Sequence, residues 1–116
     1  MTLTRAIAGL PVLLAACATS GPNASGAAGA PPGIAFEGGD GLSCEGRVVI
    51  RGARGEQQGI AAEYAWLRRR YPGHKVTGQS LGDCQQRAAD IMSIRTADGR
   101  EVEVHFDIGD FFGKGF

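Results

Sequence analysis

Residues 89–108 read ADIMSIRTADGREVEVHFDI, in which apolar and polar side chains alternate on both sides of a turn sequence. Alternation with a period of two residues is typical of a strand that has one face on the core. In the second run the residues predicted to face inward are Val102, Val104, Phe106 and Ile108, and those predicted to face outward are Glu101, Glu103, His105 and Asp107. The segment therefore predicts two antiparallel strands, Ala89 to Thr96 and Glu101 to Ile108.

The turn Ala97-Asp98-Gly99 determines how these two strands pair. A two-residue loop would place Ser93 opposite Val104 and bring polar side chains onto the apolar face. A three-residue loop places Met92 opposite Val104 and keeps the apolar side chains together. We therefore predict the longer loop, a type I turn followed by a bulge at a left-handed Gly99.

The chain before this hairpin predicts a helix and two further strands. Glu56 to Tyr71 has helical spacing and stops at Pro72-Gly73. Its predicted core stripe consists of Ile60, Ala61, Tyr64, Ala65, Leu67 and Tyr71. A strand is expected from Leu42 to Arg51, and a weaker one from His74 to Leu81. The predicted class is α+β, with one helix packed on a four-stranded, mainly antiparallel sheet in the order β-α-β-β-β.

The N-terminal residues resemble an export signal. Met1 to Arg5 carries one positive charge, and Ala6 to Ala16 is an apolar run too short to span a bilayer. The run ends in Leu14-Ala15-Ala16-Cys17, which resembles the lipobox of bacterial lipoproteins. The resemblance implies cleavage before Cys17, lipidation of its thiol and acylation (palmitate) of its amino group. Ala18, in place of Asp, implies the outer membrane, facing the periplasm. An ordinary secretory signal cut near Ala16 is the alternative.

The chain divides into three predicted regions. Residues 1–16 are the predicted lipoprotein signal peptide, and residues 17–33 are the lipidated cysteine and a linker of small residues, Gly and Pro. Residues 34–116 are the predicted globular domain. The 12 basic and 12 acidic residues of the chain cancel, which leaves no global field to attract nucleic acid. We therefore expect no nucleic-acid partner.

The helix and the strands after it, Gly59 to Phe116, resemble the PepSY module in layout. The shared features are an amphipathic helix, a Pro-Gly stop, three strands, an acidic-Gly hairpin and the ending Phe106-Asp107-Ile108-Gly109. PepSY modules occur in exported bacterial proteins. The resemblance implies a binding or inhibitory module without chemistry of its own.

With Cys17 assigned to lipid, Cys44 and Cys84 remain as a pair in an oxidising compartment. We expect a structural disulfide, which would stabilise the domain by about 4 kcal/mol in the chain-entropy model. A redox-active pair and two free thiols are the alternatives, although the spacing is not that of a Cys-x-x-Cys motif.

Metal binding and catalysis have weaker support. His74, His105 and Asp107 could in principle hold zinc or copper, but solvated polar side chains are the favoured interpretation, and no cofactor is expected. The sequence has no Gly-x-Ser-x-Gly elbow, phosphate-binding glycine loop or dinucleotide fingerprint. We predict no catalytic residue and no enzymatic activity.

Basic and aromatic residues are the candidates for partner binding. The residues singled out are Trp66, Arg68, Arg69, Arg70, Phe111 and Phe112. The arginine run, with Arg47, Arg51 and Arg54, would suit lipopolysaccharide phosphates or peptidoglycan carboxylates, or it is a solvated helix end. The Phe-rich C-terminus either folds back over the core or presents an apolar patch to a partner.

Together these features predict a membrane-anchored cell-envelope lipoprotein that acts as a non-catalytic binding or inhibitory module. Its expected partners are the membrane, through the lipid anchor, and another envelope protein. The alternatives are a structural or stress-related envelope protein without a small ligand, and a metal-binding protein that uses His74 and His105.

Overall fold

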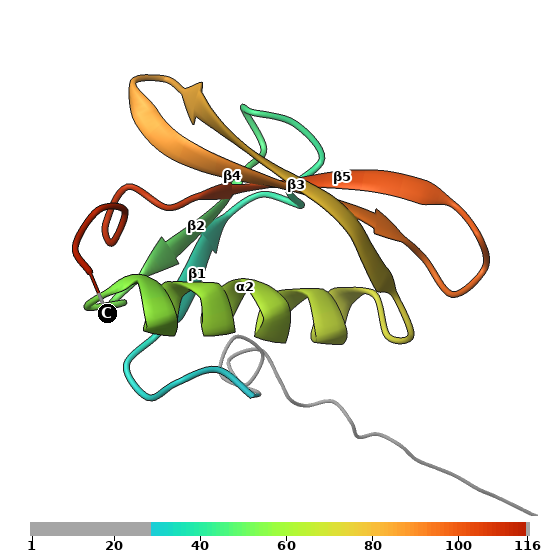
Figure 1. Cartoon of the computed structure of the whole chain (residues 1–116), viewed down its shortest axis with the longest axis horizontal. Helices are drawn as coiled ribbons and strands as arrows, with labels where there is room; N and C mark the ends of the chain where they lie inside the picture. Colours follow the sequence, from blue (N-terminus) through green and yellow to red (C-terminus); the bar gives the residue numbers. More distant parts are fainter. Residues whose placement is uncertain (1–28, 116) are drawn as a thin grey trace, which may run out of the picture.

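One helix packs across one face of a five-stranded sheet in the computed structural model, which describes residues 29–115 (Figure 1). The elements are β1 Ala35–Gly38, β2 Val48–Arg51, α2 Glu56–Arg70, β3 Lys75–Cys84, β4 Arg87–Arg95 and β5 Glu101–Asp107. The predicted α+β class with a single packed helix is confirmed. Cys17 and the predicted signal segment lie outside the described residues. Within residues 29–115, no helix has the length and apolar character needed to cross a membrane.

The sheet has one strand more than the four predicted, and it is mixed. Its order is β1-β2-β5-β4-β3, with β2 and β5 parallel and the other neighbours antiparallel. Helix α2 carries the chain from β2 to the far edge, where β3 runs in the same direction as β2. Strands β4 and β5 then occupy the positions between β3 and β2. Because each of them reverses the direction of the strand before it, β5 lies parallel to β2. This crossover explains why the expectation of a mainly antiparallel sheet was incomplete.

The predicted first strand begins too early. The chain from Gly39 to Gly46 forms a loop, in which Asp40 Oδ1 accepts a hydrogen bond from the Leu42 N–H (3.0 Å) and Ser43 Oγ accepts one from the Gly46 N–H (2.9 Å). These short polar side chains satisfy the backbone without a neighbouring strand. The additional strand β1 has only four residues and borders glycines, which is why its sequence carries no clear alternation.

The hairpin between β4 and β5 has the predicted three-residue loop. Met92 pairs with Val104 and Arg95 with Glu101, and Gly99 has a φ of 91°. The Thr96 N–H donates to the Arg100 carbonyl at 2.8 Å, which closes the loop. The requirement that apolar side chains share one face therefore determined the register correctly.

The core lies between α2 and the inner face of the sheet. Its fully buried side chains include Val48, Ile50, Leu67, Met92, Ile94, Val104 and Phe106. The predicted helix stripe was partly wrong, because Ile60 is 41% exposed and Tyr64 is 37% exposed. Ala65, Leu67 and Tyr71 are buried as predicted, whereas Gly59, Ala62 and Glu63 occupy the rest of the buried face in place of Ile60, Ala61 and Tyr64. Small residues on this face allow a close approach of the helix, which the large side chains of the predicted stripe would prevent.

The C-terminal segment folds back onto the start of the helix. Phe111 is 2% exposed, and its ring lies so close to Gly59 that a Cβ atom there would overlap it. The adjacent Phe112 is 47% exposed. Phe111 therefore covers the core, as the first alternative for the Phe-rich ending predicts, whereas Phe112 remains on the surface.

Gly59→Ala is expected to lower the free energy of unfolding by about 1 kcal/mol or more, because the added methyl group overpacks the Phe111 contact. Without this contact, replacing Gly by Ala inside a helix raises the free energy of unfolding by up to about 1 kcal/mol. A decrease would therefore indicate that Phe111 packs against Gly59. Urea unfolding measures it. Gly78→Ala is the control, since the nearest atom there is Ser93 Cβ at 3.7 Å. A gain in stability for Gly59→Ala would contradict the packing.

A disulfide and a buried carboxylate that is bound by two arginines connect distant segments of the chain at the sheet. Cys44 and Cys84 form a disulfide with a Cα–Cα distance of 5.7 Å, as predicted. Asp107, 1% exposed, accepts hydrogen bonds from Arg47 Nε (3.0 Å) and Arg87 Nε (2.9 Å). Burial alone would raise the pKa of Asp107, but the hydrogen bonds from Arg87, the Gly109 N–H and Arg47 outweigh it and lower the pKa. The outward position predicted for Asp107 is thus correct, and the two arginines cover it.

Replacement of both Cys44 and Cys84 by alanine is expected to lower the free energy of unfolding by about 4 kcal/mol, because the disulfide closes a loop with a sequence separation of 40. Urea unfolding of the oxidised protein and of the double variant measures the difference. Cys17→Ala serves as the control and should leave the unfolding midpoint unchanged. Equal midpoints for the double variant and the parent chain would argue against a stabilising disulfide.

Candidate functional site

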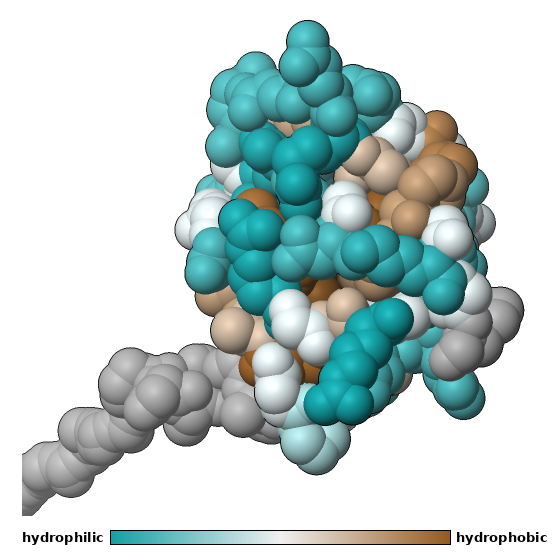
Figure 2. Space-filling view, turned by 90° about the vertical axis from the view of Figure 1, so that its left-hand side faces the viewer, coloured by the Kyte–Doolittle hydropathy of each residue, from teal (hydrophilic) through white to brown (hydrophobic). Residues whose placement is uncertain are grey.

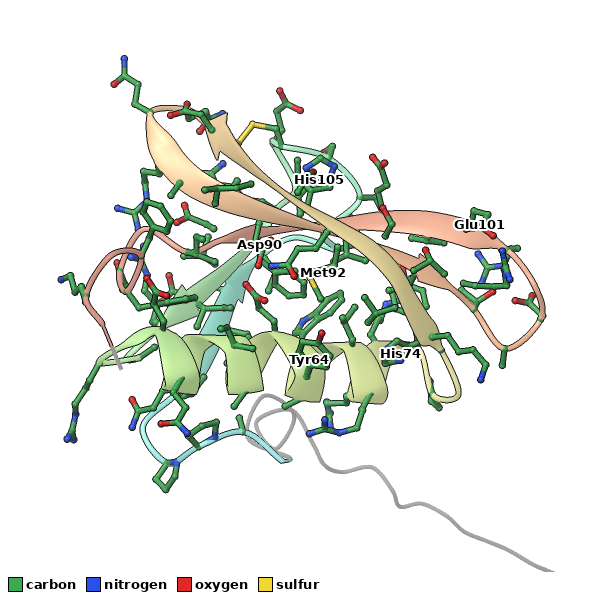
Figure 3. All side chains as sticks on the ribbon, in the orientation of Figure 1. Tyr64, His74, Asp90, Met92, Glu101 and His105 are labelled. Carbon is green, nitrogen blue, oxygen red and sulfur yellow. A yellow bond between two sulfur atoms is a disulfide. The ribbon has the colours of Figure 1, made fainter. Side chains whose placement is uncertain are left out.

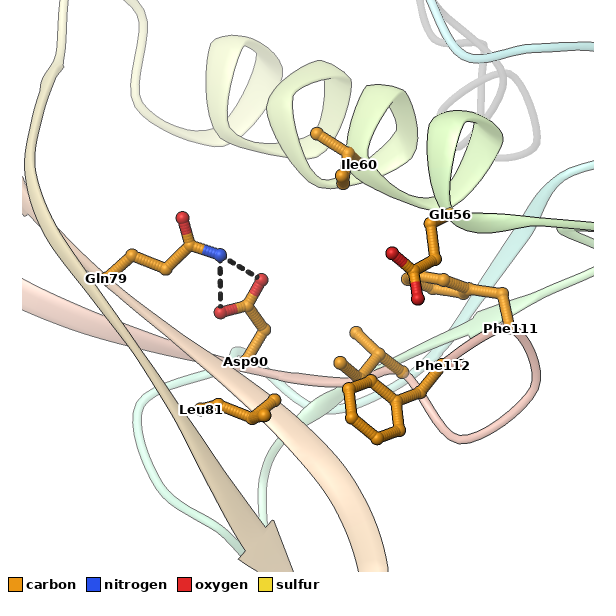
Figure 4. Close-up of a pocket in the computed structure, with 8 residues that line it drawn as sticks. Glu56, Ile60, Gln79, Leu81, Asp90, Phe111 and Phe112 are labelled. Atoms are coloured by element: carbon orange, nitrogen blue, oxygen red, sulfur yellow. Dashed lines mark hydrogen bonds between the residues drawn. The ribbon is translucent and has the colours of Figure 1, made fainter. Parts of the chain in front are cut away.

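A groove lies between the first turns of α2, the strands β3 and β4, and the C-terminal segment. It is lined by Glu56, Ile60, Gln79, Leu81, Asp90, Ile108, Phe111 and Phe112 and has a volume of about 200 Å³ (Figure 4). Helix α2 supplies one wall, β3 and β4 supply the opposite wall, and the C-terminal segment closes one end. The groove is therefore built from parts of the chain that are far apart in the sequence.

The wall of the groove is mostly apolar, and several of its large side chains reach the surface. Leu81 is 60% exposed, and Ile60 and Phe112 are also exposed. In space-filling view, hydrophobic side chains form a patch beside a mainly hydrophilic surface (Figure 2). Large apolar side chains that gather around one concavity are typical of a binding surface.

Asp90 and Gln79 form the polar side of the groove. Gln79 Nε2 donates to both carboxylate oxygens of Asp90, at 2.9 and 2.8 Å (Figure 4). Asp90 is only 4% exposed, because it lies on the inner face of β4, two residues from Met92. The carboxyl group of Asp90 therefore lies at the edge of the core and lines the groove.

Glu63 lies behind Asp90 on the buried face of the helix. It is 1% exposed, and neither of its carboxyl oxygens accepts a hydrogen bond within residues 29–115. Burial, and second the charge of the nearby Asp90, raise the pKa of Glu63 to about 10. Glu63 is therefore the member of this carboxyl pair that stays protonated, as expected where two carboxyl groups lie close together in the core.

This pair lacks the cations that neutralise other acidic side chains. Arginines pair with Glu37, Asp98, Glu101, Asp107 and Asp110. Neither Glu63 nor Asp90 takes part in any ion pair of residues 29–115. This buried carboxyl pair therefore has no cation beside it in the described part of the chain; the Gln79 amide donates to Asp90 alone, and the proton on Glu63 removes one of the two charges.

The structure separates the residues proposed for partner binding. Arg68, Arg69 and Arg70 are exposed at the end of α2, and Arg70 lies 4.8 Å above the ring of Tyr71. Trp66 is half-buried and packs edge-on against Phe106, with ring centroids 5.5 Å apart. Trp66, a residue predicted to bind a partner, thus packs against the core.

Two arginines of the proposed basic patch are bound to acidic residues. Arg47 donates to Asp107, and Arg51 donates to Glu37 and Asp110. These contacts neutralise the guanidinium groups locally and leave them less able to bind phosphates or carboxylates of a partner. Phe111 and Phe112 are the two proposed residues that the fold places in the groove.

The two histidines do not form a common site. His74 lies beside the end of the helix, where its Nδ1 is 2.9 Å from the Tyr71 carbonyl oxygen. His105 lies on the outer face of β5, away from the helix (Figure 3). Residues 29–115 contain no cluster of three or more His, Cys, Asp or Glu side chains able to hold a metal ion.

Sequence reasoning missed Glu63, Asp90 and Gln79. A signal for Asp90 was present, since the register that places Met92 inward also places Asp90 inward, two residues earlier. The burial of Glu63 depends on the rotation of the helix, which the apolar pattern did not indicate. Gln79 lies in the strand with the weakest alternation.

Glu63→Gln is expected to make the protein more stable at alkaline pH. The raised pKa means that the native state favours protonated Glu63, so its contribution is complete below the ordinary pKa of 4.5 and is lost as pH rises toward 10. Between about pH 5 and about pH 8, the parent chain should lose up to about 1.4 kcal/mol per pH unit through this group. Urea unfolding across this range measures the loss, which should disappear in Glu63→Gln.

The matched control is Glu103→Gln, which changes an exposed glutamate on β5. It should keep the pH dependence of the parent chain. Parallel pH profiles for the parent chain and Glu63→Gln would show that Glu63 is not a buried, protonated carboxyl group.

Comparison with known proteins gives no relative from which a role for this site could be transferred. The chain matches no protein-family model, no curated protein and no solved structure.

Proposed function

We propose that the protein is a non-catalytic binding module of the cell envelope, anchored in the membrane by lipid on Cys17. Its binding site is the groove between α2, β3, β4 and the C-terminal segment. The observation that supports this function best is the exposure of Leu81, Ile60 and Phe112 around one concavity. Exposure of such side chains is unfavourable in water, and a bound ligand or partner would cover them.

The position of the carboxyl pair favours binding over hydrolysis. Only Asp90 lines the groove, whereas Glu63 lies behind it and is 1% exposed. Glycoside hydrolysis by two carboxyl groups requires that both flank the bond that is cleaved. A binding site needs contact with one of them only. The pair is therefore better suited to recognition of a polar group at the end of an apolar ligand.

The Pro-rich linker and the lipobox support the cellular part of the proposal. Residues 17–33 are small residues, Gly and Pro, a composition that suits a tether between a lipid anchor and a folded domain, and its last part from Gly29 already joins the folded domain through Ala30. Two or three acyl chains give a stable anchor, at about 0.8 kcal/mol per buried methylene group. The disulfide between Cys44 and Cys84 is in keeping with an oxidising compartment.

The anchor is tested by intact mass of the full-length protein recovered from bacterial envelopes. The expected mass corresponds to cleavage before Cys17, added acyl chains and a gain of two hydrogen atoms on reduction. Cys17→Ala is the control and should leave an unlipidated chain. Recovery of an unlipidated parent chain would contradict the proposed localisation.

The groove is tested by photocrosslinking in intact envelopes. A photoreactive phenylalanine analogue at position 112 should form a discrete adduct, because this residue lines the groove. The same analogue at position 42 is the control, since Leu42 is 51% exposed but is not part of the lining. The adduct from position 112 should weaken at least several-fold in Leu81→Ser. Equal labelling from both positions would contradict binding in the groove.

A further inference from the structure

We propose that the groove binds a primary ammonium group carried on a short apolar chain, with Asp90 contacting the ammonium and Glu63 as the second, buried carboxyl group. This inference rests on the proposed function of the groove as a binding site. It adds the chemical class of the ligand.

The arrangement of the lining matches both halves of such a ligand. Asp90 lies on one side, and Phe112 and Ile60 lie across the opening from it (Figure 4). A volume of about 200 Å³ is smaller than that of a typical drug-binding pocket. It suits a short alkyl chain or a single long side chain. The apolar wall would cover the methylene groups while the polar side receives the head group.

The charge of the site favours a cation. The lining contains Glu56 and Asp90 but no Lys, Arg or His residue. Glu56 is oriented by its own contact, because its Oε2 accepts a hydrogen bond from the Gly113 N–H at 2.8 Å. An anionic ligand would meet two carboxylates, whereas an ammonium group would meet complementary charge.

Glu63 provides an independent sign that a group is missing. Its carboxyl oxygens are buried and accept no hydrogen bond from residues 29–115. Buried polar groups almost always have partners, and exceptions are often associated with a bound ligand or ion. An ammonium group has three donors, so it can bond to Asp90. It would then place a positive charge close to the buried carboxyl group of Glu63.

A metal ion fits these residues less well than an ammonium group. Divalent cations with oxygen ligands require about six donors, and the polar side of the groove presents one carboxylate and one side-chain amide. The rest of the lining near it is apolar. An alkylammonium ion needs few ligands and gains from the apolar wall, which a hydrated metal ion does not.

The test is a titration of the full chain, held in phospholipid nanodiscs, with n-hexylamine, and binding is followed by the backbone amide NMR signals of β3 and β4. Hexan-1-ol and hexanoate are the matched probes, because they share the alkyl chain and differ in the head group. Hexylammonium is expected to bind about tenfold or more tightly than hexan-1-ol, and hexanoate to bind most weakly.

Two variants assign the contact. Asp90→Asn should lower the affinity for hexylammonium about tenfold or more and leave the affinity for hexan-1-ol nearly unchanged. Glu63→Gln should leave the preference for hexylammonium nearly unchanged, because the protonated Glu63 carries no charge and does not line the groove. Glu103→Gln, on an exposed part of β5, should bind all three probes like the parent chain. The dispersion of the NMR spectrum reports whether each variant is folded.

The outcomes separate this inference from the proposed function. Equal affinity of the parent chain for hexan-1-ol and hexylamine would overturn the ammonium preference but retain the groove as a binding site. Absence of binding for all three probes would overturn the groove itself. A pentapeptide with a central lysine distinguishes the sources of the ammonium group. If it competes with hexylamine, the site accepts a partner's lysine side chain, and if it does not, the site accepts a free amine.

Discussion

The close contact between helix α2 and the C-terminal segment is the constraint on which the rest of the structure depends. Gly59 has no side chain, so the ring of Phe111 can lie directly against the helix. Glu63 lies four residues after Gly59 and so on the same face of the helix, which is the face that α2 buries. The contact with Phe111 also places Phe112 at the opening of the groove. The packing of the core, the burial of Glu63 and the position of Phe112 at the groove are therefore all linked to the contact between Gly59 and Phe111.

Much of the fold was predictable because its strongest signals are local. Alternation in β5 and the requirement for a common apolar face determined both the strand and its register with β4. The Pro-Gly stop after α2 determined the end of the helix within one residue. By contrast, β1 is too short to show a period, and the parallel pairing of β2 with β5 depends on the path of the crossover. Sequence periodicity contains no information on that path.

The candidate site was less predictable than the fold, for a related reason. Helical spacing favoured Ile60 and Tyr64 as core residues because they are the larger apolar side chains. The actual interface selects small residues, so an acidic residue at position 63 occupies the buried stripe. Nothing in a hydropathy pattern predicts that a glutamate will be buried opposite an aspartate. Only the three-dimensional packing brings the two carboxyl groups together.

The pairing of β2 with β5 has a consequence for the order in which the domain folds. Val48 and Phe106 are partners in this parallel pair, although almost the entire domain separates them in the sequence. Parallel pairing across such a separation requires closure of a long chain segment and is intrinsically slow. The pair of β2 and β5 therefore cannot form before β5 has been synthesised, so the centre of the sheet closes only after α2, β3 and β4 are available.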